Sequence, residues 1–314
     1  MIEPQKKTRI SSPALRRVGR FMRLVWCAAP LFAAPAAAER IRLTPQLHAG
    51  QVIFYQLDFV GSRTTKVESP VSTPPLPPLG NVSASCLLQV NVARVDARGI
   101  RLKTYLSEKT RASPNVSGPA PDLLIEVLVA PNGATSEIKG LEQLTAAQQF
   151  AWTGWLARFT SSWAYPKAGI HRGEKWHGSE PETTPTPLAK LVWLKKYEYV
   201  RDEPCAASAA SGASLCAVIL VRAHLYQKSP PDEATPEDYK ARHLVTRGTT
   251  NGSNETILYI SRATGLLVRA TESAAQSMDA TIALADGSNQ VRYLMDAKSR
   301  SLILLVPDSP HDVR

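Results

Sequence analysis

The sequence predicts a mainly β protein, with antiparallel sheets or meanders in two strand-rich halves that are joined by one long amphipathic helix. Apolar and polar residues alternate over most of the chain after residue 50, which is the period-2 pattern of half-buried strands. Short turn sequences separate these runs, so we expect consecutive hairpins. The chain has 24 Pro and 17 Gly but only 7% aromatic residues, a composition that favours strands and loops over a helical bundle.

Residues 1–38 have the three parts of a secretion signal. Seven basic side chains precede an apolar run, Leu24–Ala34, and the small residues 35–38 (Pro-Ala-Ala-Ala) come directly before Glu39. A signal peptidase requires this arrangement, so we expect cleavage after Ala38 and an exported protein, periplasmic or extracellular. An uncleaved membrane anchor is the alternative, although the run is short for a span. Met22 is an alternative start of the same signal.

Removal of the signal changes the charge of the chain. Seven of the 37 basic residues and one of the 27 acidic residues lie within residues 1–38, so the processed chain has a formal charge of +4 instead of +10. A nearly balanced chain lacks the basic footprint of a nucleic-acid-binding protein, so we expect no nucleic-acid partner. No transmembrane span is expected after cleavage.

Three cysteines remain after the signal. Cys205 and Cys216 lie on either side of a stretch rich in Ala, Ser and Gly, and an oxidising compartment favours a disulfide between them. Two free thiols beside a loop are the alternative. Cys86 is expected to be buried near the start of a strand.

The N-terminal strand-rich half spans residues 39–140. Its expected strands are Val52–Val60, two strands on either side of a turn at residues 96–99, and a hairpin with its turn at residues 131–133. Residues 69–80 contain five prolines. Proline fixes φ and removes a donor, so this segment is predicted to be an extended surface loop.

Residues 141–165 are expected to hold the amphipathic helix, because apolar residues at spacings of three and four place one face of Leu141–Trp163 toward a sheet. The C-terminal strand-rich half, residues 166–314, is expected to contain a short helix that starts near Thr235 with Pro236 at its first position. Its last hairpins have turns at residues 262–265 and 286–287, and Leu302–Val306 is expected to be a final strand.

The most concentrated aromatic set is also the candidate ligand-binding site. Trp152, Trp155, Phe159 and Trp163 lie on one face of the expected helix. Packing of this face on a sheet is one interpretation. The other is a lid over an apolar groove between helix and sheet, which suits acyl chains or hydrophobic peptides.

No catalytic residue is assigned. The sequence has no G-x-S-x-G, H-E-x-x-H, Walker or G-x-G-x-x-G motif, and no paired cysteine spacing for a metal. We therefore expect no metal site and no cofactor. The alternative of an extracytoplasmic hydrolase would depend on scattered residues, for which His171, Glu174 and His177 are the candidates.

Three short segments resemble an uncharacterised family of exported, strand-rich bacterial proteins of unknown function. They are residues 50–55 (GQVIFY), residues 173–176 (GEKW) and residues 259–267 (YISRATGLL). The resemblance covers most of residues 48–306 and implies an exported β-rich fold without assigning an activity. At the level of fold, the chain is also similar to periplasmic lipoprotein carriers, in which helices cover a half-barrel.

Together these observations predict an exported, non-catalytic protein that binds an apolar ligand or a partner protein in a groove between helix and sheet. An extracytoplasmic hydrolase and a structural module of an envelope assembly are the two alternatives.

Overall fold

The computed structural model describes residues 39–69, 80–108, 123–182, 186–205 and 214–306. These residues belong to a single unit, 38–314. The predicted signal at residues 1–38 and nearly all of the predicted proline-rich loop lie outside the described residues. The C-terminal residues 307–314 do as well.

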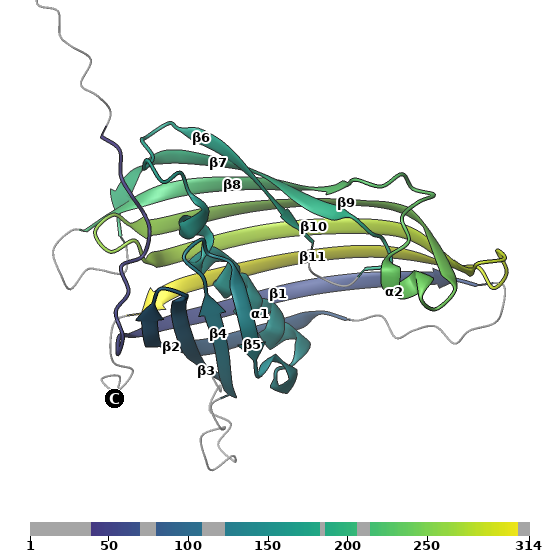
Figure 1. Ribbon diagram of the computed structural model, residues 1–314, viewed down its shortest axis with the longest axis horizontal. Coiled ribbons are helices and arrows are strands. Elements are labelled where there is room, and N and C mark those ends of the chain that lie inside the picture. The colour runs from purple at the N-terminus through teal and green to yellow at the C-terminus, as the bar shows by residue number, and fades with distance from the viewer. Residues whose placement is uncertain (1–38, 70–79, 109–122, 183–185, 206–213, 307–314) are drawn as a thin grey trace, which may run out of the picture. The chain divides into compact units, whose positions relative to one another are not determined.

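The strands and helices follow one another in a simple order (Figure 1). They are β1 (Val52–Glu68), β2 (Val82–Asp96), β3 (Gly99–Glu108), β4 (Leu123–Val129), β5 (Thr135–Lys139), the 3-10 helix η1 (Leu141–Gln143), α1 (Ala146–Phe159), the 3-10 helix η2 (Ser161–Ala164), β6 (Lys175–Pro181), β7 (Leu191–Pro204), β8 (Leu215–Gln227), α2 (Glu237–Lys240), β9 (Leu244–Ser261), β10 (Leu267–Leu284) and β11 (Val291–Val306).

All eleven strands form one sheet in the order β5-β4-β3-β2-β1-β11-β10-β9-β8-β7-β6. Each neighbouring pair is antiparallel, which confirms the predicted mainly β, antiparallel class. The division into two halves joined by a helix is not confirmed. The first strand pairs with the last, from Phe54↔Val306 to Glu68↔Arg292, so both strand-rich segments belong to the same sheet.

Two of the predicted hairpin turns are confirmed, and in each a short polar side chain accepts a hydrogen bond from a backbone N–H group of the turn. Asp96 Oδ1 accepts a hydrogen bond from Arg98 N at 2.8 Å between β2 and β3, and Asn132 Oδ1 accepts from Ala134 N at 3.0 Å between β4 and β5. The strands themselves are longer than expected. The sequence predicts separate strands at Leu266–Thr271 and over the apolar alternation from Met278 to Leu284, but both belong to β10. The middle of β10 contains small and polar residues instead of an apolar alternation, so the sequence pattern does not show that it is continuous.

The expected long helix is divided into three parts, η1, α1 and η2. Thr145 has an extended backbone and caps α1. Its hydroxyl accepts from Gln148 N at 3.3 Å, and Gln148 Oε1 accepts from Thr145 N at 2.8 Å, which is a capping box. A residue with extended φ and ψ cannot continue a helix, so α1 begins at Ala146 and not at Leu141.

The predicted short helix is present as α2, but Pro236 is its N-cap and not its first residue. The side chain of Thr235 does not cap α2 and is bonded to β9 instead. Its hydroxyl accepts from Thr246 N at 2.9 Å and donates to Thr246 O at 3.2 Å, which attaches this segment to β9.

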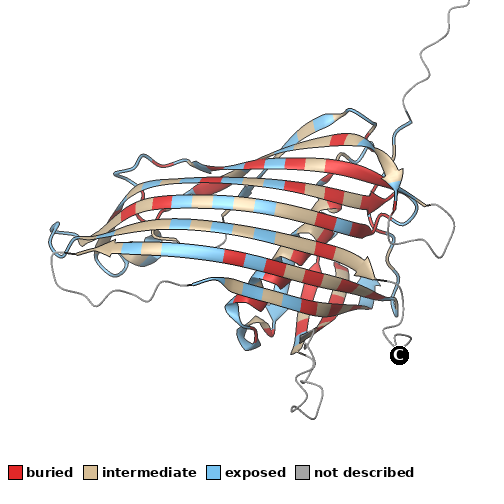
Figure 2. Cartoon of the chain, turned by 180° about the vertical axis from the view of Figure 1, so that it is seen from behind, coloured by how far each residue is buried: buried red, intermediate tan, exposed pale blue. Residues whose placement is uncertain are grey.

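The main core lies between α1 and one face of the sheet, which we call the inner face. On β1 the buried side chains are every second residue, Ile53, Tyr55, Leu57 and Phe59, as the pleat of a strand requires. Figure 2 shows that buried positions are concentrated toward the end of the long strands that carries β2–β5. A smaller cluster lies further along, formed by Leu188, Leu191, Leu225, Ala234, Met278 and Ala280.

Between these two clusters the inner face is open. We use the term open inner face for Asn254, Ala274, Gln276, Ala297 and Ser299, all of which are half-buried. They lie on the inner face because successive side chains of β9, β10 and β11 point to opposite faces of the sheet, and the buried Ala270 and Met278 mark the inner face on either side of the middle of β10.

Among the described residues, no helix is both long enough and apolar enough to cross a bilayer.

The segment before β1 explains one of the sequence motifs. Leu43 is buried, Ile41 pairs with Ile170, and Gln46 N donates to Thr264 O at 3.0 Å. Gly265 has φ of +69°, and a Cβ there would lie 2.4 Å from the carbonyl oxygen of Thr44. The Thr-Gly turn is therefore needed for the close approach of this segment.

Candidate functional site

The predicted ligand-binding residues form one row of rings along α1 and η2. Ring centroids are 6.2 Å apart for Trp152–Trp155, 5.0 Å for Trp155–Phe159 and 5.6 Å for Phe159–Trp163. Trp152 and Trp155 have no exposed surface, Phe159 is 1% exposed, and Trp163 is half-buried. The spacing of three and four residues therefore places the four side chains together.

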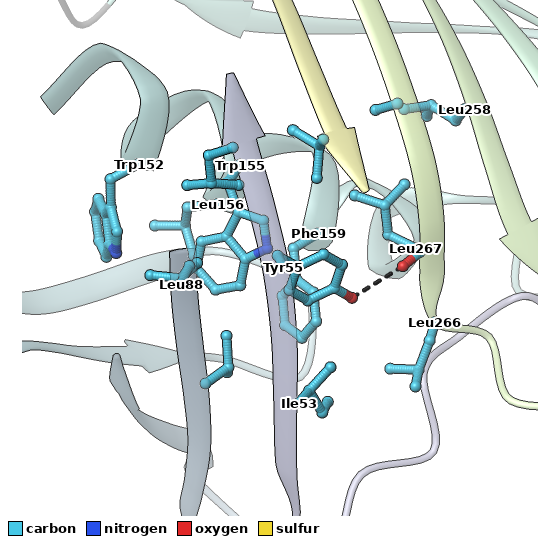
Figure 3. Packing of buried hydrophobic residues seen from close by; sticks show 14 of the residues in the cluster. Ile53, Tyr55, Leu88, Trp152, Trp155, Leu156, Phe159, Leu258, Leu266 and Leu267 are labelled. Atoms are coloured by element: carbon cyan, nitrogen blue, oxygen red, sulfur yellow. Dashed lines mark hydrogen bonds between the residues drawn. The ribbon is translucent and has the colours of Figure 1, made fainter. Parts of the chain in front are cut away.

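The sheet supplies the facing side of this row, where Tyr55 of β1 packs against the rings (Figure 3). Its ring centroid lies 5.8 Å from that of Trp155 and 6.2 Å from that of Phe159. The Tyr55 hydroxyl donates to Leu267 O at 2.9 Å, and burial raises the pKa of this hydroxyl well above its usual range. Tyr55 is therefore a neutral, fixed part of the contact.

The indole donors of the row differ in their partners. Trp152 Nε1 donates to Thr104 Oγ1 at 3.0 Å, and Thr104 in turn donates to Ile125 O at 3.1 Å. Trp155 Nε1 is buried and has no hydrogen-bond partner, and the same holds for Trp176 Nε1 on β6. Most buried polar groups in proteins are paired, so these two donors require an explanation.

The row reaches the surface at both ends. At one end, Phe150 of α1 is 51% exposed and stacks on Phe59 of β1 with a centroid distance of 5.5 Å. At the other, Trp163 lines a cavity of about 110 Å³ together with Leu43 and Ile170. The apolar core thus reaches the surface at Phe150 and at Trp163.

A half-buried polar network lies where α1 meets the open inner face. Arg158 of α1 forms an ion pair with Glu272 of β10, and their side chains are 17% and 13% exposed. Glu272 also accepts from Asn254 and, at 3.2 Å, from Ser301. Because every charge in this network is paired, it anchors α1 without adding net charge to the inner face.

Tyr197 of β7 borders the same network. The pKa of the Tyr197 hydroxyl is raised to about 12, chiefly by burial and also by the negative charge of Glu180, while the positive charge of Arg158 acts in the opposite direction. Tyr197 is therefore protonated at neutral pH and offers a neutral hydroxyl to this region.

Sequence reasoning missed Tyr55, Phe59 and Phe150. The signal for Phe150 was a large apolar residue outside the main stripe of α1, between Gln149 and Ala151. An aromatic ring outside the buried face of a helix is exposed to water unless another group covers it. Such a residue therefore indicates a surface that binds a ligand or a partner.

The residues considered for hydrolysis are only partly brought together. His171 Nδ1 lies 3.0 Å from Glu174 Oε2, which also lies 3.6 Å from Arg40. His177 is exposed and follows the inward-packed Trp176 on β6, so it faces the opposite side of the sheet. Within the described ranges, no group of three or more His, Cys, Asp or Glu residues could hold a metal ion.

Two of the sequence expectations concern cysteines. The disulfide between Cys205 and Cys216 is present and joins the end of β7 to the start of β8. Cys86 is fully buried on β2, where it lies opposite Leu57.

A second charge cluster, which is partly exposed, connects residues next to this disulfide. Asp202 of β7 is 10% exposed and accepts hydrogen bonds from the Tyr199 hydroxyl at 2.5 Å, from Arg172 at 2.8 Å and from Arg262 at 3.2 Å. Burial opposes ionisation most strongly, but the hydrogen bonds from Tyr199 and Arg172 and the charge of Arg262 outweigh it, so the pKa of Asp202 lies below its usual value.

This lowered pKa predicts a loss of stability in acid. A carboxyl group whose pKa is lower in the folded state stabilises that state above its unfolded pKa of about 4, and the contribution disappears as the pH falls through the folded value. We expect Asp202→Asn to reduce the acid-induced loss of unfolding free energy between pH 6 and pH 3 by about 1 kcal/mol. Urea titrations at each pH measure this loss. Asp296→Asn is the control, because Asp296 is exposed on β11 and lies outside this cluster, and an equal effect there would contradict the assignment to Asp202.

No family model and no curated protein matches the chain. Among solved structures, the crystal structure of the outer membrane protein OprG from Pseudomonas aeruginosa is similar over 84% of this chain and 97% of that chain. The sequence identity is 9% and the TM-score is 0.17. A TM-score of this size is below that of a shared fold, so the functional conclusions rest on the residues of this chain alone.

Proposed function

We propose that the chain is an exported, non-catalytic protein that binds an apolar ligand between α1 and the inner face of the sheet. The ligand lies along the row formed by Trp152, Trp155, Phe159 and Trp163. Helix α1 is the lid and moves away from the sheet when the ligand enters.

The observation that carries this proposal is the exposed ring of Phe150 stacked on Phe59. A solvent-exposed aromatic ring normally costs solvation free energy, and here the ring contacts Phe59, which belongs to the same apolar cluster as the buried aromatic row. An apolar chain that enters beside Phe150 replaces water on this ring and then meets only apolar surface.

The contacts of α1 with the sheet are compatible with a lid. They are mostly between apolar side chains, which are not directional, so an acyl chain can substitute for them at small cost in free energy. The directional contacts from α1 to the sheet include the Trp152–Thr104 hydrogen bond and the Arg158–Glu272 ion pair. The open inner face leaves room next to α1 for its displacement.

Export is supported by the disulfide. A bond between Cys205 and Cys216 persists in an oxidising compartment and is reduced in the cytoplasm of most organisms. This agrees with the secretion signal that the sequence predicts for residues 1–38.

The proposal predicts that Phe150→Ser weakens binding of an apolar probe about tenfold, because the serine cannot cover the ligand chain. The probe is N-phenyl-1-naphthylamine, whose fluorescence rises in an apolar environment, added to the purified full chain. The unfolding free energy is expected to change by less than about 1 kcal/mol, since Phe150 is half exposed.

Tyr226→Ser is the matched control for this experiment. Tyr226 is 53% exposed on β8 and follows the inward-facing Leu225, so its ring lies on the outer face. We expect its affinity to equal that of the unmodified chain. Equal weakening by both substitutions, or no probe binding at all, would overturn the proposed site and favour a protein partner or an envelope assembly.

A further inference from the structure

The buried indole of Trp155 has a hydrogen-bond donor without an acceptor. Three other aromatic donors are paired: Trp152 Nε1 with Thr104, the Tyr55 hydroxyl with Leu267 O, and the half-buried Trp193 Nε1 with Glu182 at 2.8 Å. The Tyr165 hydroxyl and Trp176 Nε1 are buried without a partner, as Trp155 Nε1 is. Trp155 Nε1 is buried as completely as Trp152, yet no acceptor meets it. This N–H group therefore loses its hydrogen bonds to water on folding and gains none within the protein, which is unfavourable.

The surroundings of Trp155 explain why the protein cannot supply the acceptor. Its ring neighbours are Trp152, Phe159 and Tyr55. Trp152 presents an indole N–H that can only donate, and Phe159 presents only carbon. The Tyr55 oxygen could accept, but the hydrogen bond that its hydroxyl donates to Leu267 O holds it there, and it does not meet Trp155 Nε1. Trp176 Nε1, packed against the same apolar cluster, is a second unpaired donor.

We propose that Trp155 Nε1 is the specificity-determining donor for the ligand, and that it pairs with a neutral carbonyl oxygen of an ester or amide on an acyl chain. This inference rests on the proposed function, since it assigns the chemistry of a ligand bound beneath α1. An indole N–H only donates, so its partner must be an acceptor, which a plain hydrocarbon does not contain.

The charge of the site selects a neutral acceptor over a carboxylate. The cation nearest along α1 is Arg158, and it is already paired with Glu272. A carboxylate beside Trp155 would be buried without a counter-charge, which is far more costly than burial of a hydrogen-bonded carbonyl. A neutral ester or amide therefore fits this site, and a free fatty-acid anion does not.

The test compares ligands of nearly equal size that differ in their acceptor group and charge. Methyl dodecanoate, pentadecane and dodecanoate are used to displace N-phenyl-1-naphthylamine from the full chain at pH 7. We expect the methyl ester to bind about tenfold more tightly than pentadecane and than the dodecanoate anion. In Trp155→Phe, which keeps an aromatic ring and removes the donor, we expect the preference for the ester to disappear while pentadecane binds within twofold of its original affinity.

Trp193→Phe is the matched control, because it makes the same chemical change in the second cluster, outside the proposed site. It is expected to retain the tenfold preference. A second measurement does not depend on any variant. The indole N–H resonance of Trp155 in the unmodified chain, labelled with nitrogen-15, is expected to move downfield on addition of the ester and to stay in place with pentadecane.

The outcomes separate the two proposals. Binding of ester and hydrocarbon with equal affinity, or a preference that survives in Trp155→Phe, overturns the assignment to Trp155 and leaves the apolar site intact. An indole resonance that does not respond to the bound ester overturns it as well. If neither compound displaces the dye and the dye itself does not bind, the proposed function fails, and this inference fails with it.

Discussion

Replacing Trp152 with alanine is expected to lower the free energy of unfolding by about 4 kcal/mol, within the range of about 3–5 kcal/mol that large-to-small substitutions of buried aromatic residues cost. Trp152 has no exposed surface, so the truncation removes its transfer free energy and leaves a cavity between α1 and the sheet. It also removes the donor to Thr104 Oγ1, a fully buried hydroxyl. Both effects act in the same direction.

Urea titration followed by circular dichroism measures this loss, and Phe150→Ala is the control. Phe150 lies on the same helix and has a similar aromatic side chain, but it is half exposed, so we expect a loss of about 1 kcal/mol or less. Similar losses for the two variants would contradict the packing of α1 described above. The contrast also separates the two roles assigned to the helix, because Phe150 is placed at the ligand and Trp152 also anchors the lid.

The sequence predicted the hairpins well because their turns have local chemical signals. The Asp96–Gly99 turn is an example, where an aspartate binds the backbone and Gly99 has φ of +132°. The sequence predicted strand lengths poorly. The middle parts of β10 and β11 contribute side chains to the open inner face, and neither face of the sheet is fully buried there. The alternation of apolar and polar residues that marks a strand is therefore absent from these segments.

Strands β7 and β8 were missed for a different reason. The sequence did contain a signal for β8, since Cys216–Val221 is a continuous apolar run that is mostly buried in the structure. A continuous run does not show the period-2 pattern, although it is typical of a strand with both faces covered. The length of the run, which begins at the second half-cystine, would have identified it as a strand.

The joining of the two strand-rich segments could not be deduced from the sequence. Alternation shows which face of β1 is buried, but it contains no information on which strand lies beside it. The pairing of Phe54 with Val306 connects residues at opposite ends of the described chain. Only the completed order of all eleven strands places β1 and β11 side by side in the middle of the sheet.

The candidate site could be predicted only in part. Helical spacing is sufficient to place Trp152, Trp155 and Phe159 on one face. It cannot show that Trp152 finds an acceptor on β3 and that Trp155 finds none, because the acceptor belongs to a strand some 50 residues earlier in the sequence. The difference between these two tryptophans, on which the ligand chemistry rests, is a property of the tertiary structure.

Removal of the disulfide is expected to lower the free energy of unfolding by about 3 kcal/mol, the value that chain entropy gives for a closed loop of this length. Cys205 and Cys216 are separated by 11 positions and are both buried, together with Val268. The bond connects two strands that already pair next to it, with Glu203 opposite Cys216. The native sheet therefore gains little from the bond, and its main effect is to restrict the unfolded chain.

The double variant Cys205→Ala/Cys216→Ala is the appropriate test, because alanine avoids placing an unpaired hydroxyl group in a buried site. Urea titration of the unmodified chain in the presence of a thiol reductant is expected to reproduce the loss, and the same reductant is expected to have no effect on the double variant. A reductant effect that persists in the double variant would assign the loss to another group, with Cys86 the first to examine. Since the same bond forms only in an oxidising compartment, a chain produced in a reducing cytoplasm is expected to have the stability of the double variant, and this links the fold of the sheet to the compartment proposed for the protein.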